Sequence, residues 1–154
     1  MTQVFPFSAQ PITADKVFPV ILTSEMPESL GYLASLDADA IWRLFYRLPP
    51  TLPSGTRKLL LVGQANATTG VAKLNVTWKS WGANEVPAAA SLTAEGVSTM
   101  TFATAAYRLT ELKVTLDADT LVASELVMID LTGETSGWTL AATLGILPPP
   151  IIWE

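Results

Sequence analysis

The sequence alternates apolar and polar side chains with a period of two along much of its length. The clearest case is residues 72–79, where one set alternates with another: Ala72, Leu74, Val76 and Trp78 with Lys73, Asn75, Thr77 and Lys79. Successive side chains of a β-strand point to opposite faces of the sheet. This pattern therefore predicts a strand with one buried face and one face in water.

Five further segments show strand patterns. Residues 42–48, 99–104 and 112–116 read as half-buried strands, although Arg43, Phe45 and Arg47 leave the second face of 42–48 only half polar. Residues 58–62 and 126–131 are apolar on both faces, which is typical of central strands covered by protein on each side.

Turn signals separate these runs. They are Pro49-Pro50, Pro53-Ser54-Gly55, Thr69-Gly70, Gly82-Ala83-Asn84, Glu95-Gly96 and Ser136-Gly137. Helix has only two short candidates, residues 29–36 and 88–94, and neither carries a long apolar stripe. The prediction is an all-β chain, a single β-sandwich or jelly roll over residues 32–154.

Residues 1–31 form a predicted extended N-terminal arm, because four prolines recur through it and disfavour helix. Phe5, Phe7 and Phe18 lie beside prolines in this arm and are candidate interface anchors. The arm lies either over this subunit's own sheet or over a neighbour's, and an ordinary edge strand followed by a loop is the plainer alternative.

The last residues are unusually apolar. Three prolines, at 148–150, precede Ile151, Ile152 and Trp153. Ends of a chain fray unless they are tied down. These three side chains are therefore further interface candidates. The segment that carries them either pairs as a last strand of the same subunit or docks onto a neighbour.

The composition of the chain limits the classes of partner that it is expected to bind. The 154 residues suit one domain. With 49% hydrophobic and only 15% charged residues, the chain must either hide its apolar side chains very efficiently or bury some of them against partners, and we interpret the composition as a sign of self-association. A net charge of -5 argues against nucleic acid. No apolar run is long enough to span a membrane, and no secretory signal is expected.

The chain has no histidine and no cysteine. This removes the commonest general base and metal ligand and the usual nucleophile arrangements, so neither an enzyme nor a cofactor or metal site is expected. Glu111, Glu125 and Glu134 are the carboxylates open to glycosidase chemistry, and surface acids are the plainer interpretation. The repeated Asp-Ala-Asp at 37–39 and 117–119 is a weak calcium pattern that we interpret as turns.

The aromatic residues leave a glycan-binding role open. Trp42 and Trp78 fall on the apolar faces of their strands and are predicted to be core. Trp81 follows off that phase and beside a glycine, so we expect it to be exposed and to be an interface candidate. With Tyr107 it is a candidate platform for stacking on sugar rings.

A family resemblance follows from this order of motifs. Trp42-x-x-Phe45-x-x-x-Pro49, then Pro53-Ser54-Gly55, Thr69-Gly70 and Leu74-x-Val76-x-Trp78, resembles small jelly-roll structural proteins of tailed bacteriophages. The later segments at 109–116 and 123–131 are similar to their closing strands, although Ser124-Glu125 stands where a Gly-Asp pair is common.

The resemblance implies a capsid decoration or cement protein, or a head-fibre protein, that is usually a homotrimer. Its expected partners are copies of itself and the major capsid protein or another virion protein, and its expected location is the virion, assembled in the host cytoplasm. The alternative is a carbohydrate-binding module, or a fibre or tail appendage that recognises a host glycan.

Overall fold

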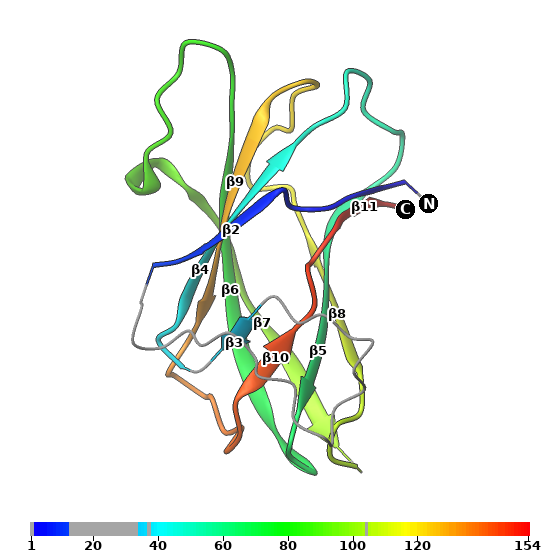
Figure 1. Cartoon of the computed structure of the whole chain (residues 1–154), viewed down its shortest axis with the longest axis vertical. Helices are drawn as coiled ribbons and strands as arrows, with labels where there is room; N and C mark the ends of the chain where they lie inside the picture. Colours follow the sequence, from blue (N-terminus) through cyan, green and yellow to red (C-terminus); the bar gives the residue numbers. More distant parts are fainter. Residues whose placement is uncertain (1, 13–33, 37, 104) are drawn as a thin grey trace.

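Two antiparallel sheets pack face to face in the computed structural model, which describes residues 2–12, 34–36, 38–103 and 105–154 (Figure 1). The predicted β-sandwich is confirmed. Its strands are β1 (Gln3–Val4), β2 (Ser8–Pro11), β3 (Ala34–Leu36), β4 (Ile41–Arg47), β5 (Arg57–Ala65), β6 (Thr69–Trp81), β7 (Thr93–Ala103), β8 (Thr110–Thr115), β9 (Leu126–Gly133), β10 (Leu144–Ile146) and β11 (Ile151–Trp153).

The first sheet, sheet A, is built around β5. Strand β8 pairs along one edge of β5, while β11 and β10 pair with the two ends of its other edge, followed outward by β1 and β3. The second sheet, sheet B, has the order β2-β4-β9-β6-β7. Strands β5 and β9 are therefore central, as their two-sided apolar sequences predict.

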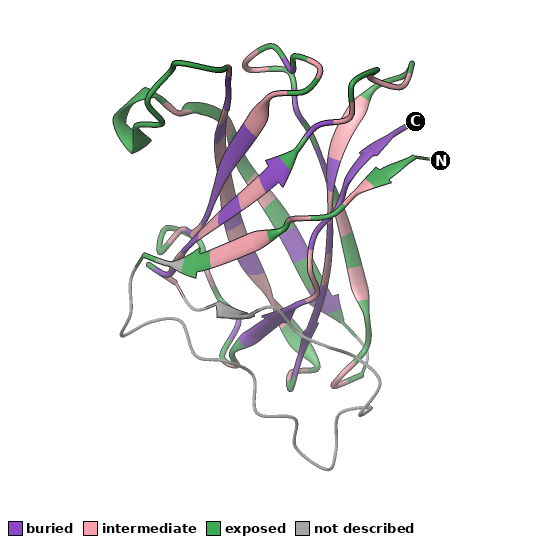
Figure 2. Cartoon of the chain, turned by 45° about the horizontal axis from the view of Figure 1, so that its top comes forward, coloured by how far each residue is buried: buried purple, intermediate pink, exposed green. Residues whose placement is uncertain are grey.

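The core lies between the two sheets, and both sheets contribute buried residues to it, drawn in purple along the ribbon in Figure 2. The period-two prediction is confirmed on β6, where Ala72, Leu74, Val76 and Trp78 are fully buried and belong to the core. Trp42 on β4 is also core, as predicted. Apolar burial of this kind contributes roughly 25 cal/mol per Å² to folding.

The described part of the N-terminal arm is extended and belongs to both sheets. Gln3 and Val4 pair with Ile152 and Ile151 in sheet A, whereas Ser8 to Pro11 pair with β4 in sheet B. This described part of the arm thus lies on its own subunit as two edge strands. The predicted boundary between arm and sandwich at residue 31 lies outside the described residues.

The C-terminal segment docks within the same subunit. Strand β11 sits between β1 and β5, and Ile151, Ile152 and Trp153 are buried. Leu60 N donates to Pro150 O at 3.0 Å, so the proline run itself lies along sheet A. Of the two docking modes that the sequence leaves open, the structure shows the one within the chain.

Two predicted turns lie inside strands instead. Glu95 and Gly96 form an irregularity within β7, where the pairing with β6 shifts register and Gly96 takes a φ of +91°. Thr69-Gly70 begins β6. Helix in the described part is limited to a 3-10 turn at Ala89–Ser91, and no helix there is long and apolar enough to cross a membrane.

Candidate binding surface

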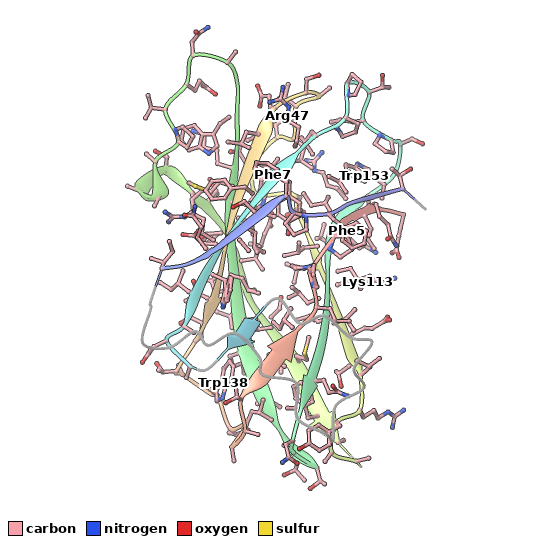
Figure 3. All side chains as sticks on the ribbon, viewed as in Figure 1. Phe5, Phe7, Arg47, Lys113, Trp138 and Trp153 are labelled. Carbon is pink, nitrogen blue, oxygen red and sulfur yellow. The ribbon has the colours of Figure 1, made fainter. Side chains whose placement is uncertain are left out.

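The first segment of the chain crosses from sheet A to sheet B and presents two aromatic rings to solvent. Phe5 and Phe7 flank Pro6 between β1 and β2 and are 55% and 64% exposed (Figures 1 and 3). Pairing on either side holds this crossing, because β1 is tied to β11 and β2 is tied to β4. Two large apolar side chains are thereby fixed at the surface.

Phe7 packs over the outer face of sheet B. Its ring centroid lies 6.4 Å from that of Phe45, with the planes tilted by 35°. Phe7 N also donates to Phe45 O at 2.9 Å. Phe45 lies between the core residues Leu44 and Tyr46 on β4, so the alternation of the strand points it away from the core.

Cross-strand pairing extends this surface over three strands. Met128 on β9 is opposite Phe45 on one side and Lys79 on the other. In the neighbouring row, Leu126 is opposite Arg47 and Trp81. Directly opposed residues of antiparallel strands share a face. Met128 and Trp81 are buried yet lie outside the core cluster, as expected for the outer face.

We call this surface the Phe7 face. It consists of Phe7, Phe45, Arg47, Lys79, Trp81 and Met128. Phe7 is predicted from its place beside a proline. Sequence reasoning missed the other members apart from Trp81, although the half-polar second face of residues 42–48 was the signal for Phe45 and Arg47.

The expectation that Trp81 is exposed is wrong. Its side chain is 7% exposed, because Lys79 Nζ lies 4.8 Å from the ring centroid and Leu126 stands opposite on β9. Its indole Nε1 is buried and has no hydrogen-bond partner in the described structure. Tyr107, the other expected sugar platform, is half-buried at a φ of +61°.

The remaining interface candidates divide into two groups. Ile151, Ile152 and Trp153 are buried in their own sandwich, so these side chains offer a partner no free surface. Their burial follows from strand pairing with β5, which sequence alone leaves open. Phe18 lies outside the described residues.

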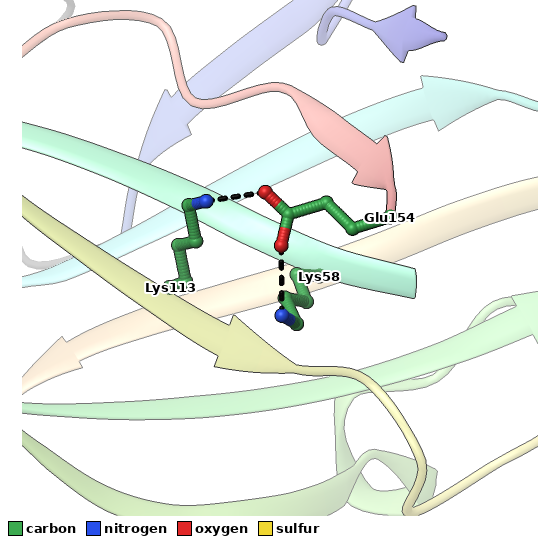
Figure 4. A network of polar contacts seen from close by, with 3 residues as sticks. All are labelled: Lys58, Lys113 and Glu154. Atoms are coloured by element: carbon green, nitrogen blue, oxygen red, sulfur yellow. Dashed lines mark hydrogen bonds and ion pairs between the residues drawn. The ribbon is translucent and has the colours of Figure 1, made fainter. Parts of the chain in front are cut away.

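Charges beside the C-terminal strand form a compact network on the outer face of sheet A (Figure 4). The Glu154 carboxylate accepts from Lys113 through one oxygen and from Lys58 through the other, at 2.8 Å. These hydrogen bonds, that of Lys113 first, lower the pKa of Glu154 from 4.5 to about 2. The network connects Glu154, the residue after β11, to β5 and β8.

The carboxylates considered for glycan cleavage lie apart. Glu111 is exposed near the start of β8 in sheet A, whereas Glu125 immediately precedes β9 in sheet B. These two strands start at opposite ends of the sandwich (Figure 1). Ser80 Oγ donates to Glu125 Oε2 at 2.5 Å. Glycosidases need two carboxyl groups across one bond, about 5 to 10 Å apart. This pair does not share a groove.

The described residues contain no cluster of three or more histidine, cysteine or acidic side chains able to hold a metal ion. A shallow depression of about 270 Å³ lies where β7 and β8 meet, lined by Thr101, Ala103, Arg108, Leu109 and Thr110. It carries one exposed cation and no aromatic ring.

Comparison with known proteins gives only distant likenesses. No protein-family model matches the chain, and no curated protein sequence matches it. The solved structure of TmCBM61 in complex with β-1,4-galactotriose is 12% identical with a TM-score of 0.43, covering 96% of this chain and 88% of that one. Xyl-CBM35 in complex with a glucuronic acid containing disaccharide is 14% identical with a TM-score of 0.42, covering 99% and 93%.

Proposed function

We propose that this chain is a non-catalytic structural protein of a virion, which decorates a coat shell and stabilises it through protein-protein contacts. The observation that carries the binding role is the pair of exposed rings, Phe5 and Phe7, on a segment tied into both sheets. The assignment to a virion rests on the family resemblance in the sequence.

Moving a phenylalanine side chain from water into an interface contributes about 1.5–3 kcal/mol, and aromatic residues dominate the centres of protein interfaces. Because strand pairing already fixes the segment that bears both rings, little conformational entropy is lost on binding. The surface is suited to contact with another protein.

The test is co-sedimentation of the purified protein with coat shells that lack it. We expect binding at micromolar concentration, and we expect the double variant F5S/F7S to lose most of it. Val86→Ser is the matched control, because Val86 is 82% exposed but lies outside the Phe7 face. No binding by the wild type, or equal binding by F5S/F7S and V86S, contradicts the proposal.

The second candidate is recognition of a glycan. What favours it is the exposed Phe7 ring on the same face as Arg47, since sugars stack on aromatic rings and accept hydrogen bonds from guanidinium groups. A glycan array with the wild type and with Phe7→Ser separates the two candidates. Selective glycan binding that F7S abolishes, together with no shell binding, makes this candidate the function.

A further inference from the structure

The Phe7 face combines apolar side chains with positive charge on an otherwise acidic protein. Arg47 and Lys79 are its two charged members, and none of the six is acidic, although the chain has 14 acids against 9 bases. The neighbouring row along the sheet is neutral, because Arg43 donates to both oxygens of Asp130 at 2.8 Å.

Its two cations differ in how they are held. The Arg47 guanidinium is exposed at the end of β4 and has no hydrogen-bond or ion-pair partner in the described part of the chain. The Lys79 ammonium lies over the Trp81 ring. Arg47 is thus free to meet a carboxylate through two parallel hydrogen bonds, the geometry in which arginine binds most strongly.

The acidic residues of the adjoining loops are engaged within the chain. Glu125 accepts from Ser80 Oγ at 2.5 Å, and Glu85 Oε2 accepts from Gly82 N at 2.7 Å. Neither carboxylate pairs with Arg47 or Lys79 in the described structure. Among the residues that the structure describes, the positive charge of the face therefore has no counterion.

We propose that the Phe7 face binds an acidic, apolar segment of a partner protein, whose carboxylates meet Arg47 and Lys79 while an apolar side chain covers Phe7 and Phe45. The proposal specifies the partner chemistry of the proposed function, and it rests on that function only in assuming that the partner is a polypeptide. Complementary charge around an apolar centre gives specificity and faster association.

The experiment uses the full chain, labelled with ¹⁵N, and a short capped peptide in which glutamates flank two leucines. The same peptide with glutamine in place of glutamate is the charge control. We expect the acidic peptide to shift amide signals of β4, β6 and the Phe7 segment. We expect the glutamine peptide to bind at least several-fold more weakly than the acidic peptide. We also expect added salt to lower the affinity of the acidic peptide.

Variants locate the contact. We expect Arg47→Glu to lower the affinity for the acidic peptide by roughly tenfold, a loss typical of a close charge pair. Arg108→Glu is its control, because it makes the same charge change at an exposed site between β7 and β8. Unchanged binding in R47E, or equal losses in both variants, overturns the proposal, as does equal binding of the two peptides.

Other occupants are outcomes of the same titration. If an oligogalacturonate, an acidic sugar polymer, shifts these signals and the peptide does not, the face binds a glycan and the proposal is wrong. If the protein associates with itself through this face without peptide, a second copy is the occupant and the proposal is again wrong. If the acidic peptide binds but the coat shells do not, the proposed virion role is wrong and the peptide-binding surface stands. If the shells bind but the peptide does not, the peptide-binding surface is wrong and the virion role stands.

Discussion

The hydroxyl of Tyr46 donates a hydrogen bond to the carbonyl oxygen of Pro149 at 2.7 Å, in the buried space between the two sheets. Tyr46 belongs to β4 of sheet B, and Pro149 leads into β11 of sheet A. This single bond joins residues 103 positions apart and ties the proline run to the opposite sheet.

Tyr46→Phe removes this bond and leaves a buried carbonyl unpaired. We expect it to lower the free energy of unfolding by about 1–3 kcal/mol, the usual cost of an unsatisfied buried group. Urea denaturation of the wild type and variant at neutral pH measures the difference. A change below about 0.5 kcal/mol would show that water or a local shift satisfies Pro149 O instead.

The same tyrosine predicts a loss of stability in alkali. Burial raises the pKa of Tyr46 well above its ordinary value of 10. Above pH 10 the unfolded chain releases this proton while the folded chain keeps it, so the free energy of unfolding falls as pH rises. Denaturation curves from pH 8 to 11 should show a shallower fall in Y46F than in the wild type. Parallel curves would contradict this origin of the pH dependence.

Glu95 connects the irregular part of β7 to β6 and to the bend that follows β8. Its Oε1 accepts from the indole Nε1 of buried Trp78 and from Ala118 N at 2.9 Å. Glu95→Ala leaves both donors unpaired, and we expect a loss of about 2–4 kcal/mol by thermal or urea unfolding. Glu95→Gln keeps an acceptor oxygen and serves as the control, with a smaller loss. Equal losses in both variants would mean that the charge, and not the acceptor, is what matters.

The network around Glu154 predicts an acidic carboxyl group. Nuclear magnetic resonance titration of this side chain should give a pKa of about 2, well below the ordinary 4.5. Since the folded pKa is lowered, any stability from the network is present above pH 4.5 and is lost as pH falls toward 2. Lys113→Ala should raise the pKa, and K58A/K113A should return it close to 4.5. A pKa of 4.5 in the wild type would show that solvent screens both contacts.

Gly55 lies close to the backbone at the C-terminal end of the chain. It has a φ of +116°, and a Cβ built there would lie 2.6 Å from Glu154 O. That oxygen also accepts from Thr56 N. Gly96 has a φ of +91° with no atom within 4 Å of such a Cβ.

We expect Gly96→Ala to cost about 1–2 kcal/mol from backbone strain alone. Gly55→Ala should cost at least about 1 kcal/mol more because of the clash. Thermal unfolding of the two variants compares them directly. Equal losses would indicate that the end of β11 shifts freely.

The alternation of side chains along each strand was determined by sequence alone. Residues 42–48 and 72–78 bury the predicted sets because the geometry of a strand fixes which side chains share a face. The apolar runs at 58–62 and 126–131 predicted that β5 and β9 are central, because apolar side chains on both faces favour a position covered by protein. The absence of histidine and cysteine likewise limits the chemistry open to the chain whatever its fold, because no arrangement in space supplies a missing imidazole or thiol.

Only the tertiary structure decided which strands are neighbours, and the surface depends on that. Trp81 is off the buried phase of β6, yet it is covered because β9 places Leu126 opposite it and Lys79 lies over its ring. The Phe7 face likewise joins side chains from β4, β6, β9 and the N-terminal crossing. Pairing between distant segments depends on packing of the whole chain, which no local pattern encodes.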